Sequence, residues 1–279
     1  MLSDFESKNF PSLLSSFRDF VSVLSEQTHS LSTTKTEIKV WQNDLEALLV
    51  KFTFHSSSIS LLAERTPINY IEGLNKIIDM SSLYLICRAQ IECYLMLHYI
   101  NISLSNDDEG EFRYSMYQIS GLNERQNYIV CEPDFKQKQK SELEIKNKII
   151  LNLEKNKIFK ALTQKERDKI IKYPKARLSS WSEMIKKSSL KDEFNLNIWS
   201  LYSKYAHSEM IGNSQLKEFV GHHKNIEVAK FNSLHLARML VCILIKDMAE
   251  HFTSCKDIFD SLTNDRKFEI ESWIKFGSK

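Results

Sequence analysis

The chain has 279 residues and a formal net charge of +2, with 42% hydrophobic and 27% charged residues. It contains only 6 Gly and 4 Pro, too few for the many tight turns of a β-sandwich or a β-barrel. The composition therefore predicts an all-α protein, a multi-helix bundle of about ten helices, which we expect to form one domain over residues 1–279.

The first third of the chain predicts three helices. Apolar residues at three- and four-residue intervals indicate an amphipathic helix from Phe10 to Leu24. The Ser/Thr-rich stretch His29–Glu37 is typical of a link, and a long second helix follows from about Thr36 to Arg65. Pro67 ends that helix. The nearly apolar run from Asn75 to Asn101 predicts a central helix of the core.

The rest of the chain continues in the same pattern. A helix is expected from Glu111 to Val130, and Pro133 marks the next break. Further helices are predicted at 134–162, 164–173, 180–187, 192–210, 226–252 and near 265–276, with Gly212 ending one of them and a link over 212–225.

Positive charge is concentrated in the middle of the chain. Between Asp134 and Lys191 there are 17 Lys and Arg residues against 7 Asp and Glu residues, a local balance of +10. Such a stretch is either a solvated lysine-rich face or an electrostatic footprint for nucleic acid or another polyanion. We interpret residues 134–191 as a basic helical subregion or an insertion within the domain, with RNA or a nucleotide as the candidate partner.

The apolar runs and the cysteines favour a cytoplasmic protein without a membrane span. The runs Leu83–Ile100 and Leu234–Ala249 are interrupted by charges, and neither offers roughly 18 or more consecutive apolar residues. The first residues, MLSDFESKNF, lack a signal-peptide pattern. The five cysteines form no C-x-x-C pair, so we expect small buried side chains in a reducing compartment.

Neither a metal nor a cofactor is expected. His222 and His223 are adjacent and have no partner at metal-ligand spacing. The phosphate-binding glycine loops and the nucleophile elbow of α/β-hydrolases are missing from the sequence. His98 and His235 occur in apolar helical runs, where a structural role is expected.

Arg88 and Glu92 are the first candidate site residues. They are one turn apart in the apolar run SLYLICRAQIECYLMLHYI, on the same face of the predicted helix. A buried charge costs several kcal/mol unless it is paired. The two residues therefore either form a structural ion pair or line a polar pocket, in which Arg88 binds an anion and Glu92 orients it or takes part in catalysis.

The stretch NIWSLYSKYAHSEM contains the second candidate. Ser203, Lys204 and His207 project onto the polar side of the predicted helix, away from its apolar stripe. Imidazole titrates near neutral pH and can give or take a proton during cleavage of a phosphodiester, while Lys204 and the neighbouring serines would hold an anionic oxygen. The alternative is an exposed histidine stabilised by the C-terminal end of a helix.

The ordered motifs H-S-S-S-I near His55, C-R-A-Q-I-E at 87–92, F-R-Y at Arg113 and Y-S-K-Y-A-H-S ending at Ser208 resemble a bacterial family of all-helical proteins. That family is in turn similar to HEPN domains, helical bundles often found as metal-independent ribonucleases in toxin–antitoxin and antiphage systems. The resemblance implies a HEPN-like core, a homodimer and a protein partner from the same operon. It adds Arg113 and Ser208 to the substrate-binding candidates. HEPN ribonucleases carry the motif R-x(4–6)-H, and the positions that would hold its arginine before His207 are Ser200, Leu201 and Tyr202, none of which is basic.

Three interpretations follow. In the first, a ribonuclease, His207 is the general base or acid for attack by the ribose 2′-OH, Arg88 stabilises the charge on the phosphate, and Glu92 orients Arg88. In the second, a non-catalytic module binds an anion, a nucleotide or a protein segment in the Arg88/Glu92/His207 pocket. In the third, these residues only fix the register of the helices.

Overall fold

The computed structural model describes residues 2–34, 38–64, 78–206, 209–221 and 223–279. These residues form thirteen α-helices, one 3-10 helix and one π-helix, and their only β pairing is an isolated bridge between Leu190 and Ser278. The all-α prediction is confirmed, and the helices outnumber the roughly ten that the sequence pattern predicted. The chain divides into two compact units, one made of 1–37, 45–97 and 185–279, the other of 38–44 and 98–184.

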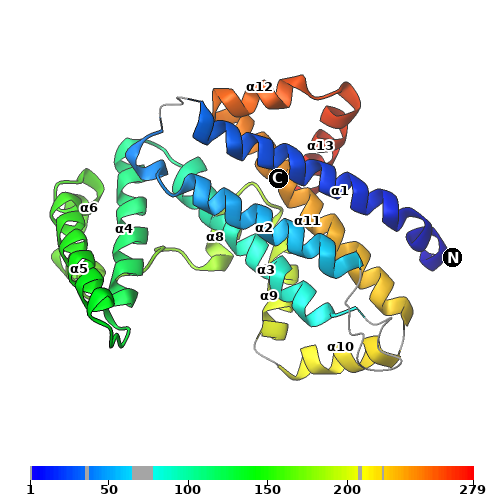
Figure 1. The fold of residues 1–279 in the computed structure, drawn as a ribbon, viewed down its shortest axis with the longest axis horizontal. Helices are drawn as coiled ribbons and strands as arrows, with labels where there is room; N and C mark the ends of the chain where they lie inside the picture. Colours follow the sequence, from blue (N-terminus) through cyan, green and yellow to red (C-terminus); the bar gives the residue numbers. More distant parts are fainter. Residues whose placement is uncertain (1, 35–37, 65–77, 207–208, 222) are drawn as a thin grey trace. The chain divides into compact units, whose positions relative to one another are not determined.

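The first unit is a bundle of long helices. Its helices are α1 (Leu2–Thr33), α2 (Leu45–Glu64), α3 (Met80–Leu97), α9 (Asp192–Ala206), α10 (Met210–Gly221), α11 (His223–His251), α12 (Thr253–Ser261) and α13 (Asn264–Gly277), while α8 (Trp181–Lys187) crosses the boundary between the units. Helix α11 packs against α1, α3, α12 and α13, and the long rods α1, α2, α3 and α11 lie along one another (Figure 1).

Helix α11 is the central helix of this unit and is predominantly apolar over its second half. All ten residues from Leu236 to Ile245 are buried, as expected for a helix enclosed by others rather than for one at the surface. Among the described residues it is the one helix long and apolar enough to cross a membrane, but 72% of its apolar window is buried inside the protein. Burial within the bundle is therefore enough to explain the apolar composition of α11.

The second unit is smaller. It contains η1 (Val40–Gln42), the π-helix η2 (His98–Ile102), α4 (Asp107–Gln126), α5 (Pro133–Leu153), α6 (Lys157–Ala161) and α7 (Gln164–Lys172). Its core consists of six residues from α4 to α7, namely Phe112, Met116, Ile119, Leu153, Phe159 and Ile170. Most of the predicted basic stretch, from residue 134 to 184, belongs to this unit.

Helix starts in the second unit are set by capping side chains. The Asn106 side chain accepts from the Glu109 amide at the start of α4, and Thr163 and Glu166 form a reciprocal capping box on α7. Pro133 occupies the first turn of α5, where its missing amide hydrogen costs nothing. The break that the sequence indicated at Pro133 is therefore a helix start.

Several predicted boundaries are wrong. The link predicted over 212–225 contains helix α10, and Gly212 lies inside that helix, where a Cβ atom would lie 3.4 Å from the Lys204 carbonyl oxygen. This glycine allows a close approach of α10 to α9 rather than ending a helix. The predicted helix 134–162 is split because Asn156 caps a new helix through its side-chain oxygen. Helix α1 extends to Thr33, into the stretch expected to be a link, and α12 was not predicted.

Candidate functional site

The predicted pair of Arg88 and Glu92 is present on α3. Arg88 Nε lies 2.9 Å from Glu92 Oε1, and the two side chains are 19% and 24% exposed. Trp199 of α9 donates its Nε1–H to the same carboxylate oxygen at 3.1 Å. The guanidinium carbon of Arg88 lies 5.8 Å from the centre of the Trp199 ring. The Glu92 carboxylate thus accepts from Arg88 on its own helix and from Trp199 on α9, and the second bond connects the two helices.

This cluster retains capacity for an anion. Arg88 uses Nε in its pair with Glu92, and its two terminal nitrogens have no hydrogen-bond partner among the described residues. A guanidinium offers five N–H donors, so four remain at a site that is partly open to solvent. The arrangement is compatible both with a structural tie and with a contact to a carboxylate or phosphate oxygen.

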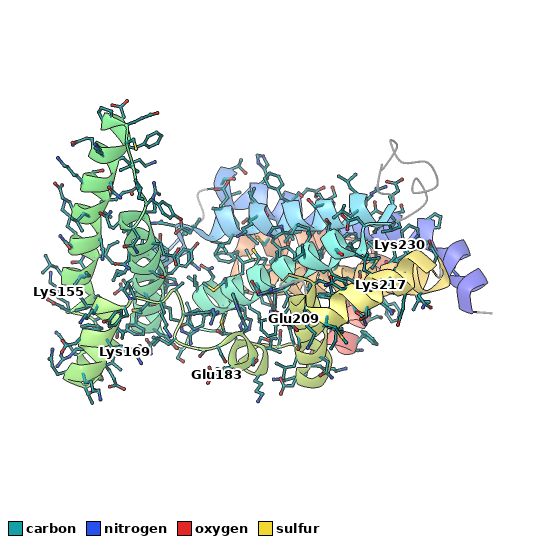
Figure 2. All side chains as sticks on the ribbon, turned by 90° about the horizontal axis from the view of Figure 1, so that it is seen from below. Lys155, Lys169, Glu183, Glu209, Lys217 and Lys230 are labelled. Atoms are coloured by element: carbon teal, nitrogen blue, oxygen red, sulfur yellow. The ribbon has the colours of Figure 1, made fainter. Side chains whose placement is uncertain are left out.

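The catalytic histidine candidate cannot be placed against this cluster. His207 and Ser208 lie outside the described residues, and α9 is described up to Ala206. Ser203 and Lys204 are half-buried on α9, and Lys204 Nζ lies 3.5 Å from Glu209 Oε2 (Glu209 is labelled in Figure 2). The convergence of Arg88, Glu92 and His207 on one cleft therefore stays a prediction.

Arg113 is occupied by contacts within the second unit. Its Nη1 donates to the Tyr99 carbonyl oxygen at 2.6 Å and to the carbonyl and hydroxyl oxygens of Ser103 at 3.2 and 3.1 Å. Its Nη2 pairs with Glu109, and the guanidinium lies over the Tyr99 ring. These bonds tie η2 to the start of α4. They give Arg113 a structural role, and its contact with a substrate stays a prediction.

Exposed lysines cover the helices of the second unit. Between residues 134 and 175, eleven lysines are exposed against five exposed acidic residues. The eleven are Lys136, Lys138, Lys140, Lys148, Lys155, Lys157, Lys160, Lys165, Lys169, Lys172 and Lys175. Only Lys157 among them has an ion pair with a described residue, at 2.8 Å from Asp108. Figure 2 labels two of the others, Lys155 and Lys169.

Three other acidic residues of this unit form ion pairs outside this group of lysines. Asp107 pairs with Lys39 and Glu109 with Arg113, both around the first turn of α4. Glu142 of α5 is buried and pairs with Arg125 at 2.6 Å. Ten of the eleven exposed lysines therefore have no ion-pair partner among the described residues, and the stretch keeps an excess of exposed positive charge over its five exposed acidic residues. Such an excess favours contact with a polyanion at moderate ionic strength.

A half-buried acid on α11, Asp247, was missed as a candidate. Burial raises the pKa of Asp247 to about 7, even though the hydrogen bond from Tyr94 and the nearby His251 lower it. The Tyr94 hydroxyl donates to Asp247 Oδ2 at 3.2 Å and lies 2.9 Å from Ser189 Oγ. An acidic residue inside a long apolar run was the available signal, the same one that singled out Arg88 and Glu92.

A cavity of about 900 Å³ in the first unit was missed as well. It is lined by residues of α3, α9, α10, α11 and α13, among them His235, which the sequence suggested was structural. Its walls come from elements separated by most of the chain, so no local pattern indicates it. In the described part of the chain, no group of three or more His, Cys, Asp or Glu side chains is arranged to hold a metal ion.

Comparisons with known proteins leave the chain without a match. A scan against protein-family models finds none, and searches of curated proteins and of solved structures find none either.

Proposed function

We propose that this protein binds RNA, acts in the cytoplasm, and uses the lysines of its second unit as the contact surface. The observation that carries the proposal is the excess of exposed, unpaired lysines between residues 136 and 175. Lysine side chains contact phosphate as flexible point charges, so such a surface supports binding with little dependence on base sequence. Exposed lysines outnumber the exposed aromatic residues of this unit, Tyr128, Phe135 and Tyr173, so we expect phosphate contacts rather than base stacking to contribute most.

The proposal is tested with two matched variants, each with four lysines replaced by glutamine. The second-unit variant carries Lys155→Gln, Lys160→Gln, Lys165→Gln and Lys169→Gln, and the first-unit control carries Lys51→Gln, Lys217→Gln, Lys256→Gln and Lys275→Gln, all at exposed positions. Both lose the same charge. Binding of a labelled single-stranded RNA is measured by fluorescence anisotropy.

The second-unit variant is expected to bind at least about tenfold more weakly than wild type, while the control stays within about twofold. Equal losses in the two variants would show that overall charge, and not this surface, attracts the RNA. No measurable binding by the wild type at low salt would end the proposal.

A second candidate function is the HEPN-like ribonuclease, in which α3 and α9 belong to a HEPN-like core. The observation that favours it is that Trp199 connects the Arg88–Glu92 pair to the same helix that leads to His207. With its terminal N–H groups available, Arg88 would stabilise the charge on the scissile phosphate, and His207 would move the proton of the 2′-OH. Partial exposure of Ser203 and Lys204 on that helix fits a role in holding the phosphate.

The ribonuclease is tested with His207→Ala. The variant is expected to abolish RNA cleavage, and growth inhibition if the protein acts as a toxin in a defence or toxin–antitoxin system, while it retains RNA binding and its melting temperature. The His251→Ala variant, at an exposed histidine of α11, is the control. Cleavage that survives His207→Ala excludes the catalytic role without affecting the binding proposal. A homodimer and an operon partner belong to this candidate, and size-exclusion chromatography with light scattering tests the dimer.

A further inference from the structure

Two groups of aromatic side chains line the cavity in the first unit. In the first group, Tyr84 of α3 stacks on Tyr202 of α9, with ring centroids 4.6 Å apart and planes at 24°. Phe219 of α10 meets Tyr84 edge-on at 6.4 Å. In the second group, Trp273 of α13 lies 4.9 Å from the ring of His235 of α11. A volume of about 900 Å³ falls within the range of cavities that hold small organic molecules.

The lining carries almost no formal charge. Among the described residues that line the cavity there is one acid, Glu218, and there is no lysine or arginine. Arg238 lies nearby but donates to Ser16 Oγ and Glu269 Oε1, both at 3.0 Å. The cavity therefore offers no cation for a phosphate or a carboxylate, in contrast to the lysine surface of the second unit.

His235 supplies an unused polar group in this apolar setting. Burial, together with the nearby Arg238 cation, lowers the pKa of His235 to about 4, so the ring is neutral at pH 7. Neither ring nitrogen has a hydrogen-bond partner among the described residues, and Nδ1 is inaccessible to solvent, which leaves Nε2 as the ring nitrogen that a ligand can reach. Polar groups in the interior of native proteins are nearly always hydrogen-bonded, so an imidazole on a cavity wall without a partner in the protein is a candidate contact for a ligand.

We propose that this cavity binds an uncharged small molecule with an aromatic ring system, which packs against these aromatic side chains and forms a hydrogen bond with His235. The aromatic side chains favour a flat ring over an aliphatic chain. The near-absence of charge selects against anions, because an ionised group would lose its hydration without gaining a cation. Two amide side chains in the lining, Asn225 and Asn232, can accept or donate further hydrogen bonds.

A matched pair of dyes tests the proposal with the full chain. N-phenylnaphthylamine is uncharged, and its analogue anilinonaphthalene sulfonate has the same rings with one negative charge. We expect saturable binding of the uncharged dye at one site, with at least about tenfold weaker binding of the sulfonate. Excitation transfer from tryptophan to the bound dye should fall in Trp273→Phe, because Trp41, Trp181 and Trp199 do not line the cavity.

Substitutions locate the site. Ala229→Phe fills the cavity from α11 and is expected to weaken binding of the uncharged dye at least about tenfold. Ala47→Phe, at an exposed position of α2, should leave its binding unchanged. If circular dichroism shows that Ala229→Phe is unfolded, Asn232→Phe provides the same block from an exposed position on the wall. Equal affinity for both dyes, or wild-type binding by the folded blocked variants, would overturn the proposal. Binding of the uncharged dye without saturation would do so as well.

Discussion

Replacing Asp247 with asparagine should change how the stability of this protein depends on pH. The pKa of Asp247 is about 7 in the folded protein against 3.8 for an ordinary aspartate, because burial on α11 disfavours its charged form. Between these values the folded state holds a proton that the unfolded state has lost. The free energy of unfolding contributed by this group is therefore fully present below pH 3.8 and is lost as the pH rises through about 7.

The size of the effect follows from the two pKa values. At about 1.4 kcal/mol for each pKa unit, the difference amounts to roughly 4 kcal/mol, an upper bound for a group that keeps some contact with water. Asparagine mimics the protonated acid and keeps a hydrogen-bonding group beside Tyr94. The unfolding free energy of Asp247→Asn minus that of wild type should thus grow by about 2 to 4 kcal/mol from pH 4 to pH 8.

Urea denaturation followed by circular dichroism at several pH values measures this difference directly. Subtracting the wild-type curve removes the contribution of the titrating groups that do not interact with Asp247. A flat difference for Asp247→Asn would refute the reasoning, because burial would then not hold the proton on this group.

Two further predictions concern packing and the Arg88–Glu92 pair. Gly110→Ala should lower the unfolding free energy by about 1 to 3 kcal/mol, because its Cβ atom would lie 2.6 Å from the Trp41 ring. Gly121 is on the same helix, and a Cβ atom there would meet nothing within 4 Å. Gly121→Ala should therefore raise the unfolding free energy by about 0.5 to 1 kcal/mol, and urea denaturation distinguishes the two outcomes. A double-mutant cycle with Arg88→Ala and Glu92→Ala should give a coupling of roughly 1 kcal/mol, and strict additivity would contradict the observed pair.

The fold class was predictable because it depends on local and compositional features. A scarcity of glycine and proline excludes a protein rich in tight turns, and the i, i+4 spacing of Arg88 and Glu92 was enough to predict their ion pair on one face of a helix. Helix boundaries were less predictable where tertiary contacts override local preference. Gly212 is typical of a helix end, yet the close packing of α10 on α9 places it inside a helix.

The parts of the candidate site that the sequence missed depend on contacts between distant residues. Trp199 bonds to Glu92 across 107 positions, and no periodicity links the two residues. The cavity combines Tyr84 of α3 with Trp273 of α13, which are separated by more than half of the chain. His235 was assigned to the core because its neighbours in sequence are apolar, and its unpaired ring nitrogens become evident only when the surrounding helices are in place. The local sequence pattern thus identifies candidate residues, whereas the packing of the helices determines which of these residues are in contact.

The salt dependence of RNA binding tests the central claim most directly. For a single-stranded RNA, the logarithm of the association constant falls with the logarithm of salt concentration by about 0.7 for each phosphate contacted. The four glutamine substitutions in the second unit should therefore reduce this slope by up to about 3, while the four in the first unit leave it unchanged. A slope that is the same for wild type and the second-unit variant would mean that these lysines contact no phosphate, and would contradict the proposed function.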